Sequence, residues 1–264
     1  MTDSEWQAFS AFRIDFKEMC RQWLNRCGYE YSAPDEAVSS VEKSVGRGTL
    51  HLLQQAAAAE NKTPAYPQET PIVYNHSLDE VHVSDQIKLI IISDNPGKNE
   101  QLHRNQRYLV GQAGKVAEGF FRRNPELNID FRREVIILNK TPVHTAKTKE
   151  LNYLLKYGGE QFRSLFEETQ RWLAFHTAAL QGSLGCPLWL VGYGELRKKS
   201  LFTAYAEELR RQYGGKSDAP VFVFQHFSMN CFAIDFKKLS DAHTSTEENL
   251  RVIGLLHRKE VLGW

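Results

Sequence analysis

Three residues with versatile hydrogen-bonding side chains each come shortly after a short apolar run. They are Asn95, Asn139 and His226. An amide donates and accepts hydrogen bonds at the same time, and a neutral imidazole has one donor and one acceptor nitrogen. Ligands of open α/β sheets bind beyond the carboxyl ends of the strands. If the apolar runs are strands of such a sheet, these three side chains can converge on one pocket.

Each of the three residues also has a simpler structural interpretation. Asn95 precedes Pro96 and fits an Asx-turn, which is the favoured interpretation when the residue is taken alone. Asn139 can cap the loop after its strand, and here the two interpretations are balanced. A histidine after a buried strand is often part of the core, but Ser228 and Asn230 follow His226 closely and favour a functional role.

The segments that position these residues alternate between two patterns from residue 87 onward. Short apolar runs predict strands at 87–92, 134–138, 188–191 and 221–224. Amphipathic stretches predict helices at about 112–123, 159–181, between 194 and 213, and 246–258. Nearly continuous apolar strands separated by helices are typical of a parallel sheet that is covered on both faces. We therefore predict a three-layer α/β/α fold with a central, mostly parallel four-stranded sheet.

The first 86 residues have a different pattern. Apolar side chains at helical spacing predict an amphipathic helix at 4–28, and a second helix is expected at about 35–60. Residues 61–86 contain three prolines and little periodicity, which indicates a connecting segment. We expect 1–86 to form a helical extension with its connection and 87–264 to form the α/β domain.

The composition is that of an ordinary globular protein. Among 264 residues, 42% are hydrophobic and 25% are charged, and no apolar run approaches the roughly 20 residues that span a bilayer. The start of the chain lacks the pattern of a secretory signal, so we expect a cytoplasmic protein without a membrane partner. The net charge of +1 neither requires nor excludes a polyanionic partner.

Basic residues gather in the sequence around the first two predicted strand ends. They are Lys98, Arg104, Arg107, Lys115, Arg122, Arg123, Lys140, Lys147 and Lys149. A basic rim there would suit phosphate groups. For any single member, a solvated surface position is the simpler interpretation.

The four cysteines form no C-x-x-C pair. Their spacing favours buried free thiols over disulfides or an iron–sulfur centre. His76 and His82 do not belong to a recognisable set of metal ligands. We therefore expect no cofactor and no metal.

The order of the motifs resembles the uracil-DNA glycosylase superfamily over about residues 87–240. The first motif is matched by Asp94-Asn95-Pro96-Gly97, with Glu100 and Tyr108-Leu109-Val110-Gly111-Gln112-Ala113-Gly114 after it. The second is matched by Ile136-Ile137-Leu138-Asn139, and the third loosely by His226-Phe227-Ser228-Met229-Asn230. Asn at position 95 is similar to the mismatch-specific and single-strand-selective branches. The chain departs from the family pattern at Ser93, which replaces Gly, at Leu109, which replaces an aromatic residue, and in the missing prolines of the third motif.

This resemblance implies a DNA repair enzyme that flips uracil, or a related damaged base, out of DNA and hydrolyses its N-glycosidic bond. Asn95 would hold the attacking water, His226 would donate a hydrogen bond to uracil O2, and Asn139 would recognise the edge of the base.

The resemblance also implies supporting contacts. Backbone at Asp94 and Gly97 would line the pocket, Tyr108 or Leu109 would cover the base, and Ser228 and Asn230 would contact the substrate. A side chain of Met229, Asn230 or Phe232 would fill the space that the flipped base leaves in the duplex. Glu100 would either orient a pocket residue or, as the favoured interpretation, be a solvated charge.

Two other functions remain open from the sequence. One is a protein of the same fold that binds a nucleobase or nucleic acid without catalysis, which the departures from the family pattern motivate. The other is a different small-molecule enzyme, such as a nucleotide hydrolase, which Glu100 and the basic residues would allow. The fold alone does not distinguish these possibilities.

Overall fold

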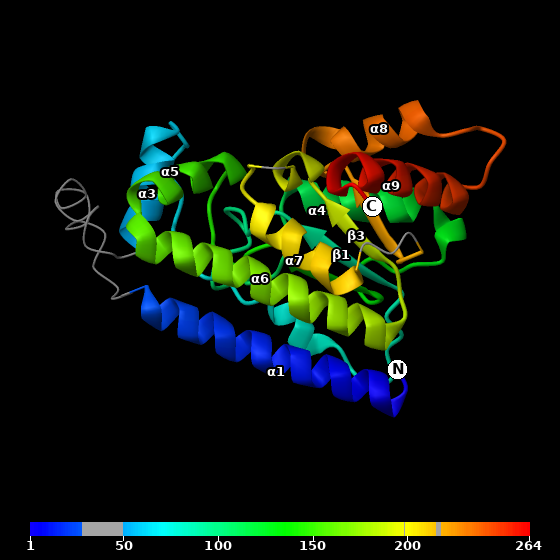
Figure 1. Cartoon of the computed structure of the whole chain (residues 1–264), viewed down its shortest axis with the longest axis horizontal. Coiled ribbons are helices and arrows are strands. Elements are labelled where there is room, and N and C mark those ends of the chain that lie inside the picture. Colours follow the sequence, from blue (N-terminus) through cyan, green and yellow to red (C-terminus); the bar gives the residue numbers. More distant parts are fainter. Residues whose placement is uncertain (28–49, 198, 215–217) are drawn as a thin grey trace.

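The computed structural model describes residues 1–27, 50–197, 199–214 and 218–264. Its centre is a sheet of four parallel strands in the order β2-β1-β3-β4 (Figure 1). The strands are β1 (Leu89–Ser93), β2 (Val135–Asn139), β3 (Leu188–Val191) and β4 (Val221–Phe224). Helices cover both faces of the sheet, so the predicted three-layer α/β/α fold is confirmed. Each predicted strand lies within two residues of the observed one, because its apolar run is also the buried segment.

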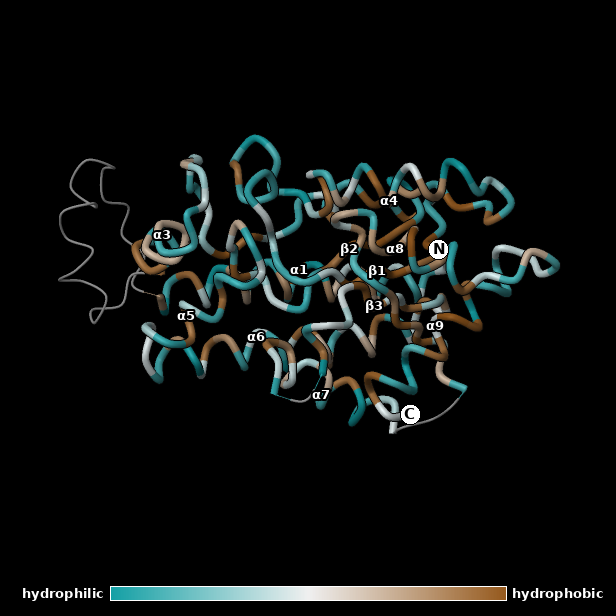
Figure 2. Tube along the Cα trace, turned by 90° about the horizontal axis from the view of Figure 1, so that it is seen from above, coloured by the Kyte–Doolittle hydropathy of each residue, from teal (hydrophilic) through white to brown (hydrophobic). Residues whose placement is uncertain are grey.

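The strands separate two apolar cores because successive side chains of a strand point to opposite faces. Ile90, Ile92 and Leu138 belong to one core, whereas Leu89 and Ile91 belong to the other. Helices α1 (Asp3–Arg26), α6 (Gly159–Leu184) and α7 (Thr203–Tyr213) pack on the first core, and α4 (Gln112–Arg123), α8 (Cys231–Leu239) and α9 (Thr246–Leu262) pack on the second. In Figure 2, apolar residues of these helices are seen around the strands.

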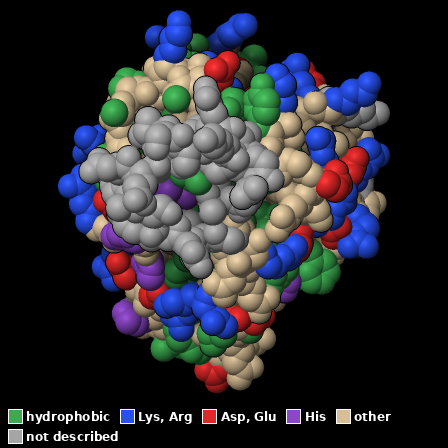
Figure 3. Space-filling view, turned by 90° about the vertical axis from the view of Figure 1, so that its left-hand side faces the viewer, with side chains coloured by type: hydrophobic (Ala, Val, Ile, Leu, Met, Phe, Trp, Pro, Cys, Tyr) green, Lys and Arg blue, Asp and Glu red, His purple; other side chains and the backbone are tan. Residues whose placement is uncertain are grey.

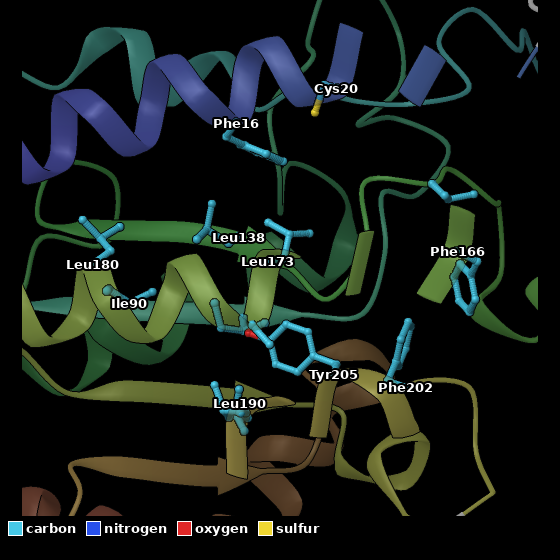
Figure 4. Close-up of a cluster of buried hydrophobic side chains, with 14 of the residues drawn as sticks. Phe16, Cys20, Ile90, Leu138, Phe166, Leu173, Leu180, Leu190, Phe202 and Tyr205 are labelled. Carbon is cyan, nitrogen blue, oxygen red and sulfur yellow. The ribbon is translucent and has the colours of Figure 1, made fainter. Parts of the chain in front are cut away.

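Helix α1 begins with a capping box. The hydroxyl of Thr2 accepts from the backbone of Glu5, and the carboxylate of Glu5 accepts from the backbone of Thr2. Its buried face consists of Phe9, Phe12, Phe16, Cys20 and Trp23, which recur at helical spacing. Figure 4 shows Phe16 and Cys20 in the same cluster as Leu138 of β2 and Leu173 and Leu180 of α6. The first helix therefore shares its core with the sheet.

Several elements differ from the sequence-based expectation. Of the helix expected at 35–60, the structure contains α3 (Leu50–Glu60), and residues 35–49 lie outside the described part of the chain. The region before Tyr213 contains a 3-10 turn at Tyr193–Leu196 followed by α7. Helices α5 (Leu151–Tyr157) and α8 were not expected, because both are short. Further 3-10 turns lie at His76–Glu80, Pro125–Leu127, Thr148–Glu150 and Ser228–Asn230.

Side chains from outside the sheet bind the backbone of its two outer strands. On β2, the amide nitrogen of Asn75 donates to the carbonyl of Ile137 at 2.8 Å. On β4, His257 Nδ1 donates to the carbonyl of Val223, and Arg258 Nη1 donates to that of Val221, both at 3.2 Å.

Within the described ranges, no helix combines the length and the apolar composition needed to span a bilayer.

Gly192, directly after β3, is held where a side chain does not fit. Its φ is 84°, and a Cβ atom there would lie 2.5 Å from Oδ1 of Asp94. We expect Gly192→Ala to lower the free energy of unfolding by about 3 kcal/mol or more, because a left-handed backbone cost of about 1–2 kcal/mol is added to a steric clash. Urea denaturation would measure the loss.

Gly185→Ala is the matched control. Gly185 also has a positive φ, of 63°, but a Cβ atom there would meet open space. Only the backbone cost of about 1–2 kcal/mol is expected for this variant. Equal losses in the two variants would contradict the close approach of Asp94 to the end of β3.

Candidate active site

The carboxyl ends of the strands bring Asn139 and His226 to either side of Ser93. Ser93 ends β1 and is paired in register with Asn139, the last residue of β2. The hydroxyl oxygen of Ser93 lies 2.9 Å from Nε2 of His226, which comes from the segment after β4. Since β3 lies between β1 and β4, the His226 side chain reaches across the end of β3. Residues far apart in sequence therefore form one polar cluster.

The contacts of Ser228 fix the proton on the His226 ring. The backbone N–H of Ser228 donates to Nδ1 at 3.0 Å, and the Ser228 hydroxyl lies 2.7 Å from the same nitrogen. Because a backbone N–H can only donate, Nδ1 is an acceptor and the proton is on Nε2. Burial lowers the pKa of His226, which keeps the ring neutral near pH 7. Nε2–H therefore donates to Ser93, and His226 does not act as a base that would make Ser93 a nucleophile.

Asn139 carries an unused hydrogen-bonding group in the interior. Its side chain is 2% exposed, and its buried amide nitrogen has no partner among the described residues. A buried donor without an acceptor costs about 1–3 kcal/mol and calls for an explanation. An acceptor on a bound ligand would supply one.

Asn95 has a fixed orientation. Its amide nitrogen donates to the hydroxyl of Thr145 at 2.9 Å and lies 3.3–3.4 Å from the carbonyl oxygens of Pro96, Val143 and Thr145. These acceptors set the amide with its nitrogen toward the loop after β2. No described residue donates to the side-chain oxygen of Asn95, so this oxygen is available as an acceptor.

A buried ion pair lies at the ends of the same strands. Nζ of Lys140 is 2.5 Å from Oδ1 of Asp94 and 2.6 Å from the carbonyl oxygen of Val191, and the Lys140 side chain is fully buried. The ammonium group also lies 5.3 Å from the centre of the Phe202 ring. Burial lowers the pKa of Lys140, while the charge of Asp94 opposes that shift. The expectation that Lys140 belongs to a basic surface rim was therefore wrong, because its charge is satisfied internally.

Glu100 is buried, which corrects the favoured interpretation as a solvated charge. Its two carboxylate oxygens accept from the backbone N–H groups of Gly97 at 3.0 Å and Leu109 at 2.8 Å. It thus ties the Asn-Pro-Gly turn to the loop before α4. Burial raises the pKa of Glu100 to about 7, although these hydrogen bonds favour the charged form.

His144 supports the same turn from the other side. Its side chain is fully buried, and Nδ1 donates to the carbonyl of Pro96 at 2.8 Å. Nε2 therefore accepts from the hydroxyl of Tyr66 at 3.0 Å. Burial lowers the pKa of His144 to about 4, so the ring is neutral near pH 7. Sequence reasoning gave it no supporting role, although it stands in the same strand-end segment as Asn139.

Other residues singled out from the sequence lie away from this cluster. Tyr108 is fully buried, and its hydroxyl donates to the carbonyl of Val73 at 2.5 Å, so it does not stand over a pocket. Leu109 is also buried, in the core beneath α4. Phe232 packs in that core as well, which leaves Met229 and Asn230 exposed on the turn beside Ser228.

A cavity of about 820 Å³ lies elsewhere, near residues 84–86 and 128–134 at the amino ends of β1 and β2. Asn95, Asn139 and His226 do not line this cavity. On the face shown in Figure 3, at the α3 and α5 end, Lys and Arg side chains are interspersed with Asp and Glu. No group of three or more His, Cys, Asp or Glu side chains in the described ranges is arranged to hold a metal ion.

Comparison of the chain with family models, with curated proteins and with solved structures found no match. The functional argument therefore rests on the geometry of the strand ends.

Glu100 makes stability depend on pH. A carboxyl group whose pKa is higher in the folded state stabilises the fold below its ordinary pKa of 4.5, and this contribution is lost as the pH rises to about 7. We expect the free energy of unfolding to fall by up to roughly 3 kcal/mol from this group between those values. In Glu100→Gln, which stays neutral, this part of the pH dependence should disappear. Denaturation at a series of pH values, with Glu118→Gln as an exposed control, would test this; parallel profiles for wild type and Glu100→Gln would contradict it.

The unused amide of Asn139 predicts an unusual tolerance. Asn139→Ala should change the free energy of unfolding by less than about 1 kcal/mol, because the loss of packing is offset by removal of an unpaired donor. Asn75→Ala, at an equally buried position beside the same strand, should lower the free energy of unfolding by about 2–4 kcal/mol. This variant leaves buried groups without a hydrogen-bond partner, among them the carbonyl of Ile137 and the backbone N–H of Tyr108. Chemical denaturation of both variants would measure the difference. Similar losses would indicate that Asn139 is paired in solution.

Proposed function

We propose that the chain is a uracil-DNA glycosylase-like enzyme that hydrolyses the N-glycosidic bond of uracil, or a related base, in DNA. The observation that carries this proposal is the buried, unpartnered amide of Asn139 beside the hydrogen-bonded pair of Ser93 and His226. These groups suit the edge of a pyrimidine, whose carbonyl oxygens accept hydrogen bonds and whose N3–H donates one. An Asn amide that donates to O4 and accepts from N3–H distinguishes uracil from cytosine.

The available oxygen of Asn95 suits the hydrolytic water. In this reaction the bond between the sugar C1′ and the base nitrogen breaks, and the electron pair leaves with the base. The water oxygen bonds to C1′, and the water proton is released. An amide oxygen orients such a water without deprotonating it strongly, so a modest rate is expected. The charge on the departing base is stabilised by donors that are already in place.

Met229 supports a role in base flipping. Its side chain is 84% exposed, and its φ of 51° places it in the left-handed region on the turn beside Ser228. An exposed apolar side chain next to the site is suited to enter the base stack at the position of the flipped nucleotide. Asn230 has the same backbone conformation, with a φ of 58°.

A second candidate function is recognition of a nucleobase without catalysis. It is favoured by the bond between Ser93 and His226, because this bond occupies the nitrogen that would otherwise donate directly to the base. A site of this kind would bind uracil or uracil-containing DNA and release nothing.

The test is base release from oligonucleotides that contain a single uracil, in single- and double-stranded form. We expect alkali-sensitive abasic sites with the wild type. The rate of base release should fall about a hundredfold or more in the Asn95→Ala, His226→Ala double variant, because the variant lacks both the acceptor that orients the water and the imidazole of the donor chain. His103→Ala, at an exposed position, is the control. Saturable binding with no abasic sites would favour the second candidate, and the absence of both binding and release would reject both.

A further inference from the structure

The direction of the hydrogen bonds around His226 carries a further inference, which rests on the proposed function. The backbone N–H of Ser228 donates to Nδ1 of His226, and Nε2–H of His226 therefore donates to the hydroxyl oxygen of Ser93. The Ser93 hydroxyl proton is not used by either of these bonds. Ser93 is thus the last donor of a chain that begins at the backbone after β4.

The position of Ser93 places this last donor next to the unpaired amide. Ser93 and Asn139 are paired in register at the carboxyl ends of β1 and β2, and both are almost fully buried. The Ser93 hydroxyl and the Asn139 amide nitrogen are therefore two neighbouring donors beside the strand ends. Two carbonyl oxygens on one planar ring would satisfy both.

We propose that Ser93, and not His226, is the residue that donates a hydrogen bond to the O2 oxygen of the departing base. As the bond to C1′ breaks, its electron pair moves to the base and negative charge builds on O2, which the Ser93 O–H stabilises. No proton is transferred: each donor keeps its hydrogen, and the chain from Ser228 through His226 polarises the Ser93 hydroxyl. His226 is then a positioning residue that acts through Ser93.

This assignment and direct donation by His226 make opposite predictions. If Ser93 contacts the base, Ser93→Ala and Ser93→Gly both remove the final donor, and base release should fall by about a hundredfold in kcat with a smaller change in KM. If His226 contacts the base, these variants free its Nε2–H, and the rate should stay the same or rise.

The acidity of the departing base provides a readout that a structural role would not change. A more acidic base such as 5-fluorouracil needs less stabilisation of its negative charge. The deficit of Ser93→Ala should therefore shrink from about a hundredfold with uracil to about tenfold or less with 5-fluorouracil in the same oligonucleotide. An equal deficit with both bases would overturn the assignment, because it would indicate general damage to the site.

The matched control is Ser183→Ala, which removes a hydroxyl that donates to the backbone carbonyl of Ala179 within α6. Its rates with both bases should equal those of the wild type. If Ser93→Ala does not fold, nitrogen NMR of His226 in the wild-type protein tests the chain directly. A proton on Nε2 supports it, and a proton on Nδ1 overturns it.

The outcomes separate this inference from the proposed function. A wild-type protein that releases neither base overturns the function, and the inference with it. A wild-type protein that releases uracil while Ser93→Ala and Ser93→Gly match its rate overturns the role of Ser93 alone.

Discussion

The ammonium group of Lys140 joins the ends of three strands. Lys140 is the residue after β2. Its ammonium group pairs with Asp94, which follows β1, and donates to the carbonyl of Val191, the last residue of β3. Removing two charges from water is costly, so such a pair does not by itself make a fold stable. Its effect is on geometry, because a buried charge that loses its partner is far more costly than one that keeps it. The chain can leave the sheet only along paths that keep Lys140 and Asp94 in contact.

The polar groups above this pair are set by that constraint. The register of β1 and β2 places Ser93 beside Asn139, and the turn after β1 is held by Glu100 on one side and His144 on the other. Burial keeps His144 and His226 neutral near pH 7, so the hydrogen-bond directions around both rings are determined by backbone partners. The site is therefore an arrangement of oriented dipoles with little net charge, which suits a neutral, planar ligand.

Apolar patterning was sufficient to predict the sheet and most of the helices, because the strands are short runs of buried Ile, Leu, Val and Phe. It did not reveal which polar residues are buried. Lys140 and Glu100 look like surface charges in the sequence, and only their long-range partners show otherwise. Tyr108 was expected to cover a ligand on the basis of a motif, yet its hydroxyl is bound within the core.

The contact between Ser93 and His226 illustrates the same limit. The two residues are 133 positions apart, and no local pattern links them. Ser93 was noticed only as a departure from a family pattern, which gives a position but not a role. Asn95, Asn139 and His226 were recognisable because each stands at or just beyond the carboxyl end of an apolar strand, where ligands of open sheets bind.

The side-chain bonds to the backbone of the outer strands β2 and β4 affect how the molecule can associate with others. Outer strands with free carbonyl groups are templates on which a strand from a second chain can form. Here Asn75 binds the backbone on the β2 side, and His257 and Arg258 bind it on the β4 side. A strand from a neighbouring molecule that paired with these carbonyl groups would have to break these bonds first, which disfavours extension of the sheet at these positions.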